Sequence, residues 1–280
     1  MSRRGVLGTF DGVHIGHRAL FFRARERAAE DAMPILALVI LRSGPFITDL
    51  CEREELLREA GADQVVFLPL EEVRHMSAED FVSYIKDEYG VSAAVCGYDF
   101  RFGKDRAGDA ALLSSLIQTD VVPEQRVDGH AVSSSRIRQA LSEGRAEEAA
   151  AMLGRSYSIS GQVGGGKRLG RTKGYPTANI PYPEGRAELR RGVYFTRVWV
   201  GEDCYDAVSN CGVCPTVQGE STVVESYLLD FHGELYGSFV KTEFLHFLRG
   251  EERFSHIDAL YERIALDKEA AIRYFKGKGE

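Results

Sequence analysis

The sequence predicts two domains of different class: a doubly wound α/β domain built on a parallel sheet, then a small antiparallel β-barrel with a C-terminal helix. In the first half, short apolar strands alternate with helical segments. After residue 154 the pattern changes to short β segments separated by glycines. A length of 280 residues suits two ordinary domains, each able to bury its own core.

The α/β domain is expected over residues 1–154. Its predicted strands cover residues 6–7, 35–41, 64–68 and 93–96, and its predicted helices cover residues 17–31, 52–60 and 78–88. A further helix over 142–154 ends the domain, with Gly154 as its stop signal. Ligands of such sheets bind beyond the carboxyl ends of the strands, so residues that directly follow a strand are candidates for a site.

The β-barrel is expected over residues 155–280. Its predicted strands cover residues 158–163, 192–200, 204–210, 222–231 and 239–248. A final helix follows, with Ser255 as its expected N-cap and an apolar face that includes Ile257 and Leu260.

Residues 8–17, Gly-Thr-Phe-Asp-Gly-Val-His-Ile-Gly-His, join the first strand to the first helix. This arrangement is typical of a phosphate cradle, because glycines let the backbone approach the anion and the helix N-terminus offers unpaired N–H groups. His14 and His17 lie one turn apart and suit contact with phosphate oxygens, although His-x-x-His is also compatible with a metal site or a helix cap. The candidate phosphate-binding residues here are Gly8, Thr9, Phe10, Asp11 and Gly16.

Two later segments of the first domain carry further candidates. Residues 132–138, Val-Ser-Ser-Ser-Arg-Ile-Arg, place hydroxyls and an arginine fork at another helix start, and the alternative is a serine N-cap beside two solvated arginines. The candidates for phosphate contact are Ser133, Ser134, Ser135 and Arg138. Asp99 follows the strand over 93–96 and is either a turn residue or part of the nucleotide site.

The second domain has its own candidate site. A glycine-rich basic loop over residues 161–171 suits an anion-binding flap, although such loops are often only turns. Its candidate phosphate-binding residues are Gly161, Gly166, Lys167, Gly170 and Arg171. The Thr177 hydroxyl and the Asn179 amide suit Mg²⁺, with Asn179 also near the nucleotide. Glu225 lies in a β segment, where a surface glutamate is the plain alternative to a catalytic one.

These motifs together resemble the bacterial bifunctional riboflavin kinase/FAD synthetase family. His-Ile-Gly-His after a strand resembles the signature of the wider nucleotidyltransferase superfamily, and the whole of residues 8–17 with Ser-Ser-x-x-Ile-Arg resembles the FMN adenylyltransferase half. Gly-Tyr-Pro-Thr-Ala-Asn at residues 174–179 resembles the riboflavin kinase motif. Similar strings at 192–194, 210–217 and 225–231 extend the resemblance over essentially the whole chain.

The resemblance implies a Rossmann-like nucleotidyltransferase domain followed by a kinase barrel, with two Mg²⁺- and ATP-dependent steps. Riboflavin would be phosphorylated to FMN by the second domain, and FMN adenylylated to FAD with release of pyrophosphate by the first. Glu225 would be the general base of the kinase step, and His14, His17 and Arg138 would act on the ATP phosphates of the second step. ATP, riboflavin and FMN are then the expected small-molecule partners.

One segment departs from the family pattern. The family usually carries a Phe-Glu-Pro-His-Pro-like segment after the second strand, whereas residues 41–46 here read Leu-Arg-Ser-Gly-Pro-Phe, and only Pro45 matches. The alternative is therefore a monofunctional riboflavin kinase whose adenylyltransferase domain is impaired. An adenylyltransferase acting on pantetheine phosphate and a non-enzymatic flavin sensor are more distant alternatives, which the complete kinase strings disfavour.

The composition sets outer bounds on partners and location. A net charge of −7 argues against broad nucleic-acid binding, and no apolar run approaches the ~18 residues of a membrane span. A cytoplasmic monomer or weak oligomer is expected. Cys211-x-x-Cys214 has no second cysteine or histidine pair at zinc-site spacing, so these cysteines are expected to be incidental.

Overall fold

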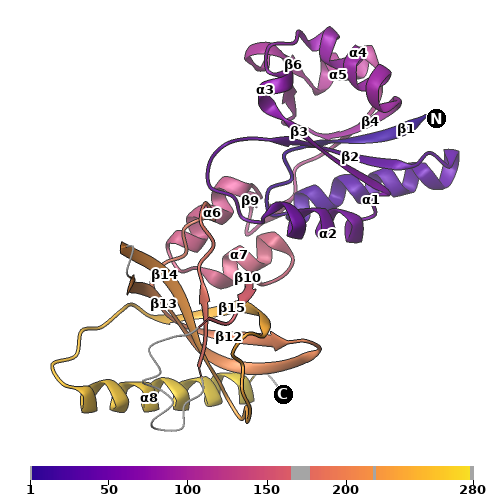
Figure 1. Cartoon of the computed structure of the whole chain (residues 1–280). Helices are drawn as coiled ribbons and strands as arrows, with labels where there is room; N and C mark the ends of the chain where they lie inside the picture. Colours follow the sequence, from indigo (N-terminus) through magenta and orange to yellow (C-terminus); the bar gives the residue numbers. More distant parts are fainter. Residues whose placement is uncertain (1, 165–176, 217–218, 278–280) are drawn as a thin grey trace. The chain divides into compact units, whose positions relative to one another are not determined.

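The computed structural model describes residues 2–164, 177–216 and 219–277, and it divides the chain into two compact units (Figure 1). The first unit comprises residues 1–137 and 152–154, and the second comprises residues 138–151 and 155–280. Residues 138–151, which precede the predicted boundary at residue 154, are thus grouped with the second unit. The domain bounds 1–154 and 155–280 stay a prediction that separate fragments would test.

The first unit is built on a five-stranded parallel sheet of order β3-β2-β1-β4-β7. Its strands are β1 (Arg3–Gly8), β2 (Ile35–Leu41), β3 (Gln64–Pro69), β4 (Val91–Gly97) and β7 (Gln118–Val122). The parallel sheet is as the sequence predicts. The fifth strand, β7, is not in the prediction, because it is short and its first three residues, Gln118, Thr119 and Asp120, are polar.

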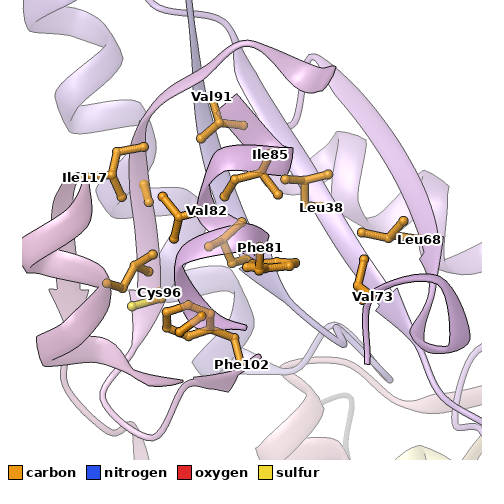
Figure 2. Close-up of a cluster of buried hydrophobic side chains, with 14 of the residues drawn as sticks. Leu38, Leu68, Val73, Phe81, Val82, Ile85, Val91, Cys96, Phe102 and Ile117 are labelled. Carbon is orange, nitrogen blue, oxygen red and sulfur yellow. The ribbon is translucent and has the colours of Figure 1, made fainter. Parts of the chain in front are cut away.

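Helices cover both faces of this sheet, which confirms the doubly wound architecture. The helices are α1 (Ile15–Asp31), α2 (Leu50–Ala60), α3 (Leu70–Val73), α4 (Ala78–Tyr89) and α5 (Ala110–Leu116). Side chains of α1 and α2, among them Phe21 and Leu57, share one core with the strands. Phe81 and Ile85 of α4 and Leu113 of α5 belong to a second core (Figure 2). From β1 the chain adds β2 and β3 on one side, and it then adds β4 and β7 on the other side. Ligands of such folds bind at the point between β1 and β4 where the strand order reverses.

Short irregular elements complete the first unit. They are the ribbon of β5 (Arg101–Phe102) and β6 (Gly108–Asp109), the 3₁₀ turn η1 (Lys104–Arg106), and the ribbon of β8 (Arg126–Val127) and β9 (His130–Ala131). They lie between β4 and α6 in the sequence, where no regular element was predicted.

The second unit is an antiparallel sheet, as predicted, but it has six strands in the order β10-β15-β12-β13-β14-β11, and the edge strand β11 is not among the five predicted. Its strands are β10 (Tyr157–Gln162), β11 (Thr177–Pro181), β12 (Gly192–Val200), β13 (Asp203–Thr216), β14 (Gly219–Leu228) and β15 (Phe239–Arg249). The Gly164 N–H donates to the Asn179 carbonyl at 2.9 Å, so the sheet curls until its two edge strands approach each other.

Helices flank this sheet in the sequence. The predicted helix over 142–154 is α7 (Ala146–Leu153), which begins four residues later than predicted because Gly144 adopts a left-handed φ of 78°. The preceding helix, α6 (Ser134–Ser142), begins in the serine segment, where the sequence predicts a helix start. The final helix α8 (Ile257–Lys276) is capped by His256, whose ring accepts from the Ala259 N–H, and not by Ser255 as predicted. No helix in the described part of the chain is long and apolar enough to cross a membrane.

Candidate active sites

The opening loop leaves the carboxyl end of β1 in an unusual backbone conformation. Phe10, Gly12 and Val13 have φ values of 49°, 83° and 38°, and the Phe10 and Val13 side chains are buried. Non-glycine residues rarely adopt a left-handed φ, and such strain gathers at functional sites. The loop is therefore fixed by its surroundings in a shape that its own residues do not favour.

His14 and His17 lie together at the N-terminus of α1. His14 is the N-cap, and its Nδ1 accepts from the His17 N–H at 3.3 Å. The two rings stack with centroids 3.6 Å apart, and the Phe10 ring meets His17 edge-on at 5.2 Å. The cap and phosphate interpretations are thus compatible, because the capped end of a long helix is also where an anion binds best.

His17 is held in its neutral form. Burial lowers its pKa well below the ordinary histidine value, and the nearby positive charges of His14 and Arg53 lower it further. Its Nδ1 is buried and has no hydrogen-bond partner among the described residues. A neutral imidazole keeps one N–H donor, so His17 can still donate to a phosphate oxygen at neutral pH.

Asp11 is mostly buried and turns toward the start of α2. Its Oδ1 accepts from the Ile47 N–H at 2.8 Å and from Arg53 Nη2 at 3.0 Å. The Gly12 N–H donates to Thr48 Oγ1 at 3.1 Å. Asp11 therefore supports the loop from within, and its direct contact with a nucleotide stays a prediction. Arg53 and Thr48 are not among the site residues predicted from the sequence.

The serine segment meets the opening loop, as the two motifs suggest. Ser134 Oγ donates to the Asp11 carbonyl at 2.9 Å, and Ser133 Oγ accepts from the Arg136 N–H at the start of α6. Two helix N-termini, those of α1 and α6, thus lie at one end of the sheet. Arg136 is not a solvated side chain, because it donates to the carbonyls of the β8–β9 ribbon.

The remaining candidates of the predicted first domain are placed as follows. Ser135 is exposed at the first turn of α6, and Arg138, one turn later, is the first residue that is grouped with the second unit. Asp99 is exposed in the turn after β4, where the Phe100 N–H donates to the Gly97 carbonyl. Gly8 ends β1, so it lies at the same edge of the sheet as this turn.

In the second unit, three predicted residues meet on neighbouring strands. Asn179 of β11 lies directly opposite Glu225 of β14. Thr177 Oγ1 donates to Glu225 Oε1 at 3.0 Å, and Asn179 Nδ2 donates to Thr177 Oγ1 at 3.3 Å. Asn210 of β13 lies opposite Glu225 on its other side, so the carboxylate has an asparagine in register on each flank. Only the strand register reveals Asn210.

The glycine-rich loop of the second unit is described only at its base. Gly161 pairs with Val240 in the sheet, whereas Gly166, Lys167, Gly170 and Arg171 lie outside the described residues. The base of the loop is joined to the Glu225 cluster through the Gly164–Asn179 hydrogen bond.

The cysteines of the described residues are free, and the deepest of them are poor nucleophiles. Burial raises the pKa of Cys211 and that of Cys96 to about 12, so both thiols stay protonated at neutral pH. No group of three or more His, Cys, Asp or Glu side chains in the described ranges is arranged to hold a metal ion. The side chain of Cys214 lies outside the described residues.

The two halves of the chain match two different family models. A FAD synthetase model matches residues 4–136, and a riboflavin kinase model matches residues 153–275. Several curated relatives are named bifunctional riboflavin kinase/FMN adenylyltransferase. The relative from Pseudomonas fluorescens is 37% identical over 95% of this chain and 91% of its own length. Those from Escherichia coli K12 and Bacillus subtilis are 33% and 32% identical, each over 96% of this chain and 92% of its own length.

A solved structure shares the whole architecture. It is titled a macrolide-efflux protein from Streptococcus pneumoniae, and it aligns with a TM-score of 0.89 and 29% identity over 96% of this chain and 93% of its own. The combination of a doubly wound unit and a curled antiparallel unit therefore occurs as one chain elsewhere.

Proposed function

This chain belongs to the bifunctional riboflavin kinase/FMN adenylyltransferase family, and we propose that each of its two structural units carries one of the two activities. The enzyme phosphorylates riboflavin to FMN and adenylylates FMN to FAD, both with ATP. The observation that supports a division of labour is that each family model falls almost entirely on one unit.

For the kinase step, Glu225 is the proposed general base. It would accept the proton of the ribityl hydroxyl as that oxygen attacks the γ-phosphorus of ATP, and ADP would leave. The Thr177 hydrogen bond fixes one carboxylate oxygen and leaves the other for the substrate. The Thr177 hydroxyl and the side-chain oxygen of Asn179 are ligands of the kind that Mg²⁺ takes, and the ion would neutralise phosphate charge there.

For the adenylyl transfer, the FMN phosphate oxygen attacks the α-phosphorus of ATP and pyrophosphate leaves. The negative charge that grows on the leaving group needs donors already in place. We assign this role to the N-terminus of α1 with His14 and His17, and to the serines at the start of α6 with Arg138. The Ser134–Asp11 hydrogen bond supports this assignment because it ties the two segments together.

The altered segment after β2 does not outweigh the family evidence. The FAD synthetase match spans residues 4–136, which includes this segment, and the relatives that cover almost the whole chain are bifunctional by name. Both favour the two-step function over a kinase with an impaired first domain.

The test of this function is the product profile of the purified chain. Riboflavin, ATP and Mg²⁺ are expected to give FMN followed by FAD, separated by liquid chromatography. FMN alone would support the impaired-domain alternative, and no turnover would support a flavin sensor. Omission of Mg²⁺ is expected to stop both steps, and fractionation of cells is expected to place the enzyme in the cytoplasm.

A further inference from the structure

We infer that Arg53 is a positioning residue for adenylyl transfer: its guanidinium holds the opening loop in the shape that presents His14 and His17 to ATP. This inference rests on the function proposed for the first unit and adds to it a residue that lies on another helix, far from the motif in sequence.

The contacts of Arg53 carry the inference. The side chain is buried at the start of α2, where only 5% of the residue is exposed. Its Nη2 donates to Asp11 Oδ1 at 3.0 Å and to the Thr48 carbonyl at 2.9 Å. Its Nη1 donates to the Thr9 carbonyl at 3.3 Å, and its Nε to Thr48 Oγ1 at 3.4 Å. One planar guanidinium thus joins Thr9 and Asp11 of the opening loop to Thr48 in the segment before α2.

The loop needs such a support. Phe10 and Val13 have a left-handed φ, and a non-glycine backbone keeps that conformation only where the surrounding structure fixes it. Thr9 and Asp11, which Arg53 holds, flank Phe10, and Thr48, which Arg53 also holds, binds the Gly12 N–H. Arg53 thus holds the residues on both sides of Phe10, and its partner Thr48 holds Gly12.

Arg53 also acts on His17 through its charge. The groups whose charges act on His17 are His14, which is stacked on its ring, and Arg53 from α2. A cation there disfavours a positive charge on the imidazole. Loss of Arg53 therefore raises the pKa of His17.

The test compares Arg53→Lys, which keeps the charge but not the planar fork, with Arg53→Met, which removes both. Arg58→Met is the matched control, because Arg58 lies on the same helix and its side chain is 51% exposed. The readouts are kcat and the KM for ATP in FAD formation from FMN, riboflavin phosphorylation by the same preparation, and the NMR titration of the His17 ring.

For Arg53→Lys we expect kcat of FAD formation to fall on the order of 10-fold to 100-fold, with a small change in KM and an unchanged His17 titration. For Arg53→Met we expect a larger loss, and we expect the His17 titration and the acid limb of the rate profile to move to higher pH. Riboflavin phosphorylation stays at the wild-type rate in both variants, and Arg58→Met matches the wild type throughout.

A wild-type kcat in both Arg53 variants, or a His17 titration that does not move in Arg53→Met, overturns the inference. If Arg53→Met does not fold, the kcat of Arg53→Lys alone decides. If the wild-type chain forms FMN but no FAD, the function proposed for the first unit fails, and the titration of His17 in Arg53→Met then decides the role of Arg53.

Discussion

Glu225 is oriented by its neighbours before any substrate binds. Thr177 donates to one carboxylate oxygen, and Asn179 and Asn210 occupy the positions directly opposite on the two flanking strands. Side chains directly opposite on antiparallel strands have Cβ atoms about 4.5–5.5 Å apart. The carboxylate is exposed, as the proposed role of a general base toward a substrate hydroxyl requires.

Glu225→Gln tests this residue. The amide keeps the shape of the side chain but cannot accept the hydroxyl proton, so we expect kcat of FMN formation to fall on the order of 10²–10⁴-fold. FAD formation from supplied FMN is expected to stay unchanged, as is the kinase rate of the control Glu202→Gln, whose residue lies in an exposed turn. An unaltered kinase rate in Glu225→Gln would remove Glu225 from the mechanism.

Some of these residues could be predicted from the sequence and others could not. Thr177 and Asn179 stand in a motif, and strand periodicity alone places them on one face. Arg53 stands in a helix rich in charged residues, where an arginine is ordinarily solvated, and its burial follows from the way in which α2 packs. Asn210 has no motif signal that points to Glu225, because only the register of β13 against β14 brings them together.

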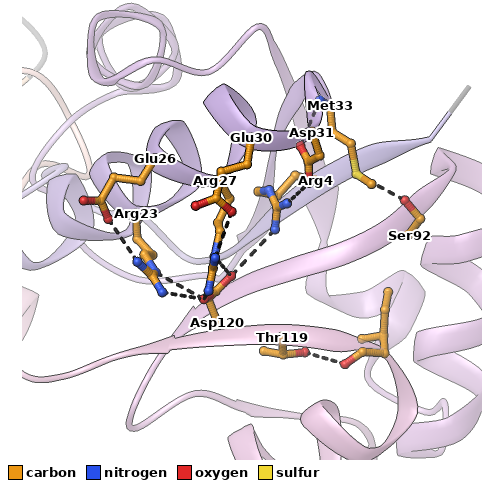
Figure 3. Close-up of polar contacts among 11 residues, drawn as sticks. Arg4, Arg23, Glu26, Arg27, Glu30, Asp31, Met33, Ser92, Thr119 and Asp120 are labelled. Atoms are coloured by element: carbon orange, nitrogen blue, oxygen red, sulfur yellow. Dashed lines mark hydrogen bonds and ion pairs between the residues drawn. The ribbon is translucent and has the colours of Figure 1, made fainter.

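At the scale of elements, a cluster of charges anchors the part of α1 that follows its N-terminal turn (Figure 3). Arg23 and Arg27 of α1 donate to Asp120 on β7, and Arg4 on β1, which is almost fully buried, pairs with both Asp120 and Asp31. Burial alone raises the pKa of Asp120, but the hydrogen bonds from Arg27 and Arg23 outweigh it and hold that pKa below the ordinary value.

Asp120→Asn is expected to lower the free energy of unfolding at pH 7 by about 1–2 kcal/mol, a figure that allows for solvent screening of the exposed arginines. A carboxyl group whose pKa is lower in the folded than in the unfolded state stabilises the folded protein at any pH above its unfolded pKa. This contribution is lost as the pH falls through the folded pKa. The difference from wild type is therefore full at pH 7 and shrinks below about pH 4.

Urea unfolding followed by circular dichroism measures the difference in unfolding free energy between Asp120→Asn and wild type at pH 7 and at pH 3. Glu26→Gln is the control, because Glu26 pairs with Arg23 at the surface and its loss is expected to change little. A difference between Asp120→Asn and wild type that is as large at pH 3 as at pH 7 would show that the charge is not the cause.

The predictions for elements succeed where apolar periodicity is strong. Strands β2 and β4 are apolar runs and were found, whereas β7 and the short ribbons are half polar and were not. Helix α7 begins later than predicted because Gly144 adopts a left-handed φ, and nothing in the neighbouring sequence Ser142-Glu-Gly-Arg indicates that conformation.

At the scale of the whole molecule, most of α6 and α7 is grouped with the second unit. Arg190 of the second unit donates from its backbone to the Leu141 carbonyl and from its side chain to the Glu143 carbonyl, and its guanidinium lies 4.4 Å from the Phe247 ring. His246 also bonds Glu147 of α7. Residues 138–151 thus stabilise the second unit, although they precede the predicted boundary.

We expect a fragment of residues 155–280 to fold and make FMN, and a fragment of residues 132–280 to be more stable because it keeps these contacts. The fluorescence of Trp199, the one tryptophan of the chain, reports the unfolding midpoint of each fragment. If fragment 155–280 is folded but inert while the full chain makes FMN, the kinase does not reside in this half alone.

The central claim is that two separate sites act in sequence, and a complementation assay tests it most directly. His17→Ala and Glu225→Gln are each supplied with riboflavin, ATP and Mg²⁺, alone and as a mixture, and the flavins are separated by chromatography. We expect His17→Ala to stop at FMN, Glu225→Gln to form almost no product, and the mixture to form FAD, because FMN released by one variant is the substrate of the other. A mixture that forms no FAD, with both variants folded and His17→Ala unable to make FMN, would mean one shared ATP site and would contradict the account.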